Sequence, residues 1–210
     1  MSIKNILFDF DGVILDSNGV RERGFEMLFA GYSAGQLDTI LRYHRNNGGL
    51  SRYHKIRYFY EEVLQKEISE EEVNQLAEKF SVLMKKELVN RALIIEDAVA
   101  FIRDNYRNYE MHIVSGSDGN ELRYLCAELG LAGYFKTIQG SPVPKITLVG
   151  EILDQYHYQK EETVLIGDSI NDYDAAKANG IGFLAYRFVS EKEIQDIRRI
   201  KSINEIQDHA

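Results

Sequence analysis

The hydrophobic pattern at the start of the chain predicts a buried strand. Residues 3–10 form a short apolar run, rich in Ile, Leu and Phe, that closes on Asp-Phe-Asp-Gly. A run of this length that ends in a turn is typical of a strand covered on both faces. We therefore expect residues 9–12 to form a loop at the carboxyl end of this strand.

From residue 16 to residue 91 the apolar positions change to helical spacing, and no strand pattern interrupts them. Two helical faces stand out, one with Tyr53, Ile56, Tyr60, Val63 and Leu64, the other with Val73, Leu76, Ala77, Phe80, Leu83, Met84 and Leu88. Ser69 and Glu72 precede the second face with the spacing of a capping box. The strongest turn signal is Asn-Asn-Gly-Gly at 46–49. The segment therefore predicts an all-helical insertion.

After residue 91, strand and helix patterns alternate. We expect helices at 96–105, 118–129, 146–157 and 173–178, and strands at 111–114, 137–139, 163–166 and 183–186. Such alternation is typical of a parallel sheet with helices on both faces. The sequence thus predicts a Rossmann-like, doubly wound α/β core from residues 1–15 and 92–210, interrupted by an all-helical insertion at 16–91.

Composition narrows the class of partner. The chain has 210 residues, 44% of them apolar, and its 33 acidic residues outnumber 25 Lys and Arg to give a net charge of −8. This balance argues against nucleic acid or an anionic membrane as a partner. The single cysteine, Cys126, allows no internal disulfide, and its spacing with neighbouring leucines favours a buried thiol. Without a signal-peptide pattern or a long apolar run, we expect a cytoplasmic protein, and by default a monomer.

Polar residues follow four of the predicted strands, at the edge where doubly wound sheets bind ligands. In strand order they are Asp9 and Asp11, then Ser115 and Gly116, then Lys145, then Asp168 and Asp172. Crowded carboxylates need a cation, and oxygen ligands suit Mg²⁺. A cation, a lysine and a hydroxyl together supply the positive charge and the donors that a phosphoryl group needs. The pattern therefore indicates phosphoryl transfer, with one carboxylate as nucleophile and another as proton carrier.

These motifs resemble, in order, those of the haloacid dehalogenase (HAD) superfamily. They read Ile-Leu-Phe-Asp-Phe-Asp-Gly-Val at 6–13, His-Ile-Val-Ser at 112–115, Pro-Lys at 144–145, and Leu-Ile-Gly-Asp-Ser-Ile-Asn-Asp at 165–172. The resemblance extends over essentially the whole chain. Asp-Ser at 16–17 and Asp-Tyr-Asp-Ala-Ala at 172–176 are similar to the phosphoglycolate-phosphatase-like branch.

The resemblance implies a Mg²⁺-dependent phosphatase for a small phosphorylated metabolite. Asp9 would be the nucleophile that becomes phosphorylated, and Asp11 the general acid and base. Residues Ser115, Gly116 and Lys145 would hold the phosphoryl oxygens. The implied metal-binding residues are Asp9, Asp11 through its backbone carbonyl, Asp168 and Asp172. The helical insertion would be a C1 cap, which closes over the site and helps to select the substrate.

Within the cap, Asn47, Arg52 and Lys55 are the candidates for substrate specificity. Asn47 and Arg52, with Asn46, suit hydroxyls and carboxylates, which favours a sugar or sugar-acid phosphate as substrate. For Arg52 and Lys55 a solvated helix surface is an equal alternative. Arg21 and Arg23 we expect to be ordinary solvated residues.

Three other functions remain open. The related β-phosphoglucomutases carry a His shortly after the first motif, and residues 16–26 contain none. A dehalogenase needs neither an acid at Asp11 nor a metal-binding pair at Asp168 and Asp172. A non-catalytic binding protein would be expected to lose some of these acidic residues, and all are present. A phosphatase is therefore the favoured prediction.

Overall fold

A six-stranded sheet, parallel throughout, organises the protein. The computed structural model describes residues 2–188 and 197–209, and the strand order is β3-β2-β1-β4-β5-β6. The strands are β1 (Asn5–Phe8), β2 (Glu110–Asp118), β3 (Thr137–Ser141), β4 (Thr163–Gly167), β5 (Gly182–Tyr186) and β6 (Arg199–Ile200). The order reverses on either side of β1, because β1 pairs with both β2 and β4. This reversal places a ligand-binding crevice beyond the carboxyl ends of β1 and β4.

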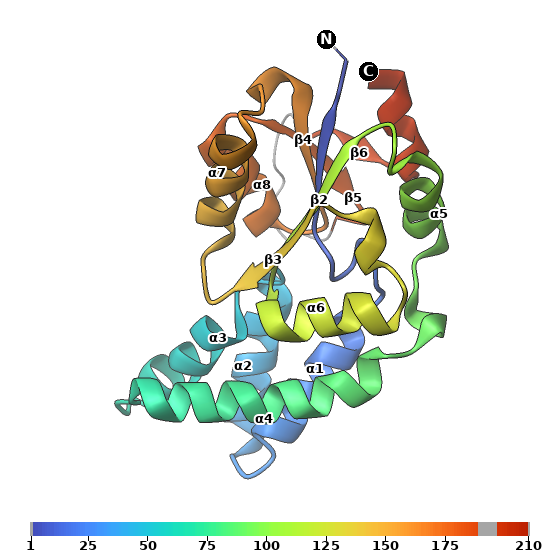
Figure 1. Ribbon diagram of the computed structural model, residues 1–210. Coiled ribbons are helices and arrows are strands. Elements are labelled where there is room, and N and C mark those ends of the chain that lie inside the picture. Colours follow the sequence, from blue (N-terminus) through green and yellow to red (C-terminus); the bar gives the residue numbers. More distant parts are fainter. Residues whose placement is uncertain (1, 189–196, 210) are drawn as a thin grey trace.

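Helices cover both faces of the sheet (Figure 1). They are α5 (Glu96–Asn105), α6 (Gly119–Glu128), α7 (Lys145–Tyr156) and α8 (Ile170–Asn179). Because side chains alternate along a strand, Leu7 packs in a cluster with α7 and α8. Its neighbours Ile6 and Phe8 pack in the other cluster, with α5 and α6. The predicted doubly wound α/β fold is confirmed.

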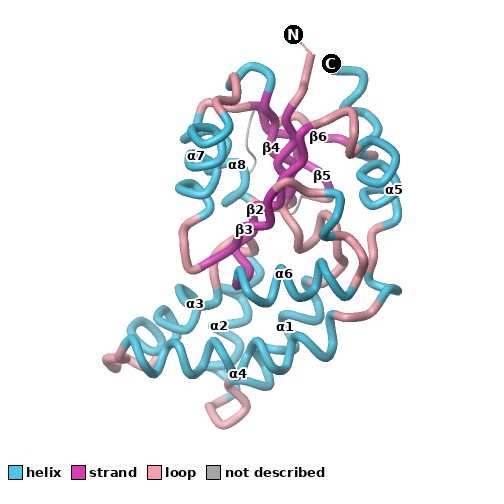
Figure 2. The backbone as a smooth tube through the Cα atoms, viewed as in Figure 1, coloured by secondary structure: helices cyan, strands magenta, loops and turns pink. Residues whose placement is uncertain are grey.

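The chain between β1 and α5 forms a group of helices at the end of the sheet toward which the strands run (Figure 2). They are α1 (Asn18–Leu28), α2 (Ala34–Asn46), α3 (Arg52–Tyr58), a π-helix (Phe59–Val63) and α4 (Glu70–Leu88). The predicted capping box is present, since the Glu72 N–H donates to Ser69 Oγ and the Ser69 N–H donates to Glu72 Oε2. We call residues 16–91 the cap, and its behaviour as a separate domain stays a prediction.

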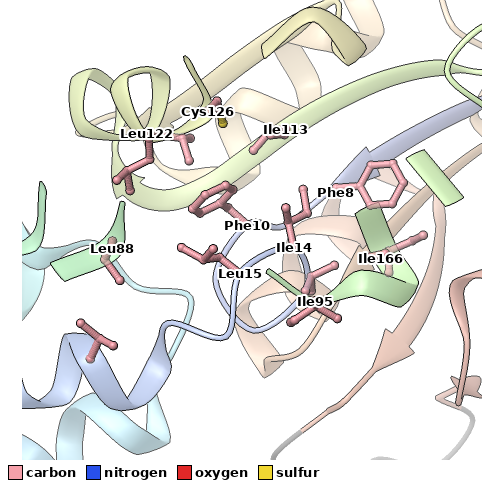
Figure 3. Close-up of a cluster of buried hydrophobic side chains, with 14 of the residues drawn as sticks. Phe8, Phe10, Ile14, Leu15, Leu88, Ile95, Ile113, Leu122, Cys126 and Ile166 are labelled. Carbon is pink, nitrogen blue, oxygen red and sulfur yellow. The ribbon is translucent and has the colours of Figure 1, made fainter. Parts of the chain in front are cut away.

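One hydrophobic cluster joins the cap to the sheet (Figure 3). Phe8 on β1 and Phe10 beyond it are fully buried, and so is Leu88 at the end of α4. Cys126 is also fully buried, on α6, as its leucine neighbours predict. Cap and core therefore share buried apolar surface. No described helix is long and apolar enough to cross a membrane.

Several predicted boundaries were wrong. Strand β2 continues to Asp118 rather than ending at residue 114, because after an irregularity in the ladder Asp118 pairs with Ser141. Helix α8 begins at Ile170, three residues early, since Asp172 accepts a hydrogen bond from the Ser169 N–H at 3.0 Å and closes the first turn. Strand β6 was missed, because two residues are too few to show a periodicity. Short helices at Arg91–Leu93, Ala132–Tyr134, Lys160–Glu162 and Ile203–His209 complete the described elements.

Candidate active site

Asp9 lies directly beyond β1 and is 2% exposed. Its Oδ1 accepts a hydrogen bond of 2.8 Å from the Phe10 N–H and forms an ion pair of 2.9 Å with Lys145 Nζ. Lys145 is the first residue of α7, where the positive end of the helix dipole makes a cation unfavourable without an anionic partner. Because both contacts fall on Oδ1, Oδ2 remains the oxygen with which this carboxylate can act.

Three buried carboxylates meet at the switch point of the sheet. One oxygen each of Asp9, Asp168 and Asp172 lies within 4.8 Å of the others. Burial and the charge of Asp172 raise the pKa of Asp9 to about 7, and burial with repulsion from Asp9 raises the pKa of Asp168 well above its usual value. Lys145 supplies one positive charge to Asp9 and Asp172. Three such carboxylates with one lysine fit a divalent cation that prefers oxygen ligands.

The loop after β1 is built for close approach. Gly12 has φ +78°, and a Cβ on it would come within 1.9 Å of Asp168 Oδ2. Asp168 Oδ2 also accepts a hydrogen bond of 2.9 Å from Asn18 Nδ2, at the start of α1. A glycine at position 12 is therefore what allows the first and fourth motifs to meet.

Asp11 is held by donors from both the core and the cap. Its carboxylate accepts hydrogen bonds from Arg21 Nε at 2.6 Å, from Ser117 Oγ at 2.5 Å and from Ser17 Oγ. Burial alone would raise the pKa of Asp11, but the charge of Arg21 and the hydrogen bonds from Ser117, Ser17 and Arg21 together outweigh it and lower the pKa below its usual value. Asp11 is therefore ionised in this arrangement.

Arg21 and Arg52, both from the cap, converge on Glu121 of core helix α6. Arg21 Nη1 donates to Glu121 Oε1 at 2.9 Å, and Arg52 donates to both carboxylate oxygens at 2.7 Å. Arg52 also donates to Ser81 Oγ at 2.7 Å. Glu121 is fully buried, and Arg21 is 6% exposed. The expectation that Arg21 is solvated was wrong, because folding brings it against Asp11, ten residues earlier, and against Glu121, 100 residues later.

Lys55 is a buried lysine that forms no ion pair with any described carboxylate. Its Nζ lies 2.9 Å from His44 Nδ1 and 3.3 Å from the carbonyl oxygen of Gly48, and Lys55 is 2% exposed. Burial, and next the nearby charge of Arg21, lower the pKa of Lys55 to about 7. The cap therefore contributes three buried basic side chains, Arg21, Arg52 and Lys55, to one enclosed space.

That space is a cavity of about 30 Å³ between the cap and the core. Its lining includes Asp9, Asp11, Asn18, Arg21, Phe25, His44, Arg52, Lys55, Phe80, Ser115, Gly116, Ser117 and Asp168. The cap rests directly on the core here, since a Cβ on Gly116 would come within 2.2 Å of the carbonyl oxygen of Gly49. The structure therefore has the cap closed over the carboxylates.

Most of the residues singled out in the sequence meet at this cavity. Lys145 and Asp172 lie behind Asp9, in contact with one another. Asn47 does not line the cavity, because its side chain donates to the carbonyl oxygen of Tyr43 at 2.9 Å within its own turn. The roles of all these residues stay predictions.

Three contributors were missed from sequence. Glu121 looked like an ordinary residue of an amphipathic helix. Ser117 stands two residues after Ser115 in a strand longer than expected, and Asn18 lies just beyond the first motif. No local pattern marks Glu121, whereas the polar residues that follow Ser115 and Asp16 are a usable signal for the other two.

The chain matches the haloacid dehalogenase-like hydrolase family over residues 6–186. It therefore belongs to this family and is a hydrolase, as the motifs predicted. A 5'-nucleotidase of Pseudomonas aeruginosa is 26% identical over 200 residues, covering 91% of this chain and 86% of that protein.

Solved structures agree with the fold. A predicted phosphatase from Clostridium acetobutylicum superposes with a TM-score of 0.77 at 15% identity, covering 100% of this chain and 98% of that one. A predicted phosphoglycolate phosphatase from Haemophilus somnus gives 0.73 at 14% identity, with the same two coverages. The named relatives are phosphoric monoester hydrolases, which is the class of enzyme the sequence predicted.

Proposed function

We propose that this protein is a Mg²⁺-dependent phosphatase that hydrolyses the phosphomonoester of a small metabolite through an aspartyl-phosphate at Asp9. The observation that carries the proposal is the pairing of Asp9 with Lys145 at 2.9 Å beside two further buried carboxylates. A carboxylate with one oxygen held and the other available is suited to attack phosphorus.

Asp9, Asp168 and the backbone carbonyl of Asp11 are the groups we expect to hold Mg²⁺, with Asp172 as a further ligand or an anchor for its waters. When bound, the ion would offset the repulsion between an anionic nucleophile and an anionic phosphate. Lys145 already sits against Asp9, so its Nζ can neutralise the same region. Ser115 is 1% exposed at the cavity wall and can donate to a phosphoryl oxygen.

In the first step, an oxygen of Asp9 bonds to phosphorus as the bond from phosphorus to the ester oxygen breaks. The leaving oxygen takes its proton from the carboxyl of Asp11. In the second step Asp11, now a carboxylate, removes a proton from water, which attacks phosphorus and releases phosphate from Asp9. In this structure Asp11 is ionised, which is the form that it needs for the second step. The first step needs a protonated Asp11, and Arg21 favours the ionised form. The contact between Asp11 and Arg21 therefore has to loosen before the first step.

The test is phosphate release from a panel of phosphomonoesters, with and without Mg²⁺. The panel contains short phosphorylated acids, sugar phosphates and nucleoside monophosphates, the last because of the 5'-nucleotidase relative. Asp9→Asn should lower turnover roughly 1,000-fold or more. Asp16→Asn is the matched control, because Asp16 is exposed on the same loop and pairs only with Arg187 among the described residues.

Chelation should abolish turnover and added Mg²⁺ should restore it. The phosphorylated protein should release its phosphate on treatment with hydroxylamine, as acyl phosphates do. Turnover that survives in Asp9→Asn, or in excess chelator, would contradict the mechanism. Return of the phosphoryl group to another position of the substrate, without free phosphate, would indicate the mutase instead.

A further inference from the structure

Three basic side chains of the cap line the cavity, but the ion pairs among the described residues engage only two of them. Arg21, Arg52 and Lys55 are the basic residues, and the carboxylates that contact them are Asp11 and Glu121. Arg21 contacts both carboxylates and Arg52 contacts Glu121, which leaves Lys55 without an anionic partner among the described residues. A buried ammonium group is costly unless it is paired.

A second donor at the same cavity also lacks a partner. Arg21 Nη2 is buried and makes no hydrogen bond with the described residues, although Nε and Nη1 of the same guanidinium are both engaged. A buried donor left unpaired costs free energy comparable to a lost hydrogen bond. Among the described residues, Lys55 Nζ has two hydrogen-bonding neighbours, His44 Nδ1 and the Gly48 carbonyl oxygen, and it lies 5.9 Å from the centre of the Phe25 ring. An ammonium group has three N–H donors, so one is left to spare.

We propose that Lys55 and Arg21 Nη2 form a subsite for a second anionic group of the substrate. The proposal rests on the phosphatase function above and specifies its substrate class: a phosphomonoester whose leaving group is short and carries a carboxylate or a second phosphate. The phosphoryl group occupies the core side, near Asp9 and Ser115, and the second anion occupies the cap side. Because the closed cavity is only about 30 Å³, the cap has to open to admit any substrate, and a short leaving group lets it close again most nearly.

The subsite also explains why the cap would close on the right substrate. Lys55 and Arg21 belong to the cap, whereas Asp9 and Ser115 belong to the core. A molecule with one anion at each end bonds to both parts, and its binding free energy then favours the closed form. A substrate with a neutral leaving group gains nothing from the cap cations.

Two matched ligands test the proposal: 2-phosphoglycolate, and 2-hydroxyethyl phosphate, in which a neutral hydroxymethyl group replaces the carboxylate. Ethylene glycol bisphosphate supplies a phosphate as the second anion and distinguishes the two anion types. Their dissociation constants are measured by calorimetry with Mg²⁺ present on Asp9→Asn, which is designed not to consume them. Their kcat/KM values are measured on the enzyme with Asp9 intact.

We expect at least one ligand with a second anionic group to bind roughly 10- to 100-fold more tightly than 2-hydroxyethyl phosphate, the range for a hydrogen bond to a charged group. Lys55→Met should remove most of that ratio by weakening only the ligands with a second anionic group, and Lys55→Arg should restore part of it. Lys79→Met, an exposed position on cap helix α4, is the matched control and should leave the ratio unchanged.

Equal affinity for ligands with and without the second anionic group would overturn the subsite. So would an equal loss for both in Lys55→Met, which would assign Lys55 to cap structure. The binding measurement separates this inference from the proposed function. Selective binding of ligands with a second anionic group, without any turnover, would reject the phosphatase and keep the subsite. Turnover only of phosphomonoesters with an uncharged leaving group would keep the phosphatase and reject the subsite.

Discussion

Glu121→Gln should destabilise the protein more than any single surface substitution. Glu121 is fully buried and accepts three hydrogen bonds, of 2.9, 2.7 and 2.7 Å, from two cap arginines. A glutamine keeps one side-chain oxygen, but its NH₂ group would face Arg52 Nη1, and both of these groups are hydrogen-bond donors. Arg52, which contacts no carboxylate but Glu121 among the described residues, would become an unpaired buried charge.

The size of the effect follows from that environment. Removal of one partner of a buried ion pair costs about 3 to 5 kcal/mol, because the other charge stays buried. For a chain of this length, each kcal/mol lost from the free energy of unfolding lowers the melting temperature by about 2 to 4 °C. Tm should therefore fall by roughly 6 to 20 °C. Burial opposes ionisation of Glu121, but the charge of Arg21 and the contacts of Arg52 keep its pKa below the usual value.

Urea titration followed by circular dichroism measures the free energy of unfolding of both proteins. Glu128→Gln is the control, since Glu128 is exposed on the same helix, and it should change stability by less than about 0.5 kcal/mol. In Glu121→Gln combined with Arg52→Gln, the two losses should be less than additive, because each removes the same contact. A loss below about 1 kcal/mol in Glu121→Gln would refute the reasoning, since it would mean that water already compensates these charges.

Two further perturbations test cap closure and the sheet. Gly116→Ala should lower kcat/KM about 100-fold, since its Cβ would meet the Gly49 carbonyl oxygen at 2.2 Å and hold the cap away from the core. Gly133→Ala is the control, because no atom lies within 4 Å of the Cβ position there. Equal kcat/KM in the two variants would contradict this reasoning. Burial, and next Lys136, lower the pKa of His112 to about 4 from 6.5, against a smaller opposing effect of Glu110. The unfolded chain therefore takes up a proton at His112 below pH 6.5, whereas the folded chain takes it up only near pH 4. As the pH falls from 6.5 to 4, the free energy of unfolding should therefore decrease by roughly 3 kcal/mol more in the wild type than in His112→Gln. Parallel pH profiles of the two proteins would exclude this effect.

The core of the site was predictable because its residues follow strands. Asp9, Lys145 and Asp168 each stand at the end of a strand or the start of a helix, and parallel strands bring their carboxyl ends to one edge. The order of the motifs therefore already implied that the side chains meet. Charge repulsion among the carboxylates also indicated a cation from sequence alone.

The cap side was not predictable in the same way. Arg21 and Arg52 look like solvated residues on helices, and their burial depends on how the cap packs against α6. Glu121 lies 100 residues from Arg21 and 69 from Arg52 in sequence, so no spacing rule relates them. The same packing decided that Asn47 supports its own turn while Lys55 lines the cavity.

The sequence by itself determined the fold class, the family and which polar residues stand at the sheet edge, because strand periodicity and strand ends are local properties of the chain. The tertiary structure alone decided that the cap is closed, that Arg21 holds Asp11, and that Lys55 is buried without a carboxylate partner among the described residues. These depend on contacts between helices far apart in sequence, whose relative position is set by packing and charge pairing across the interface between cap and core.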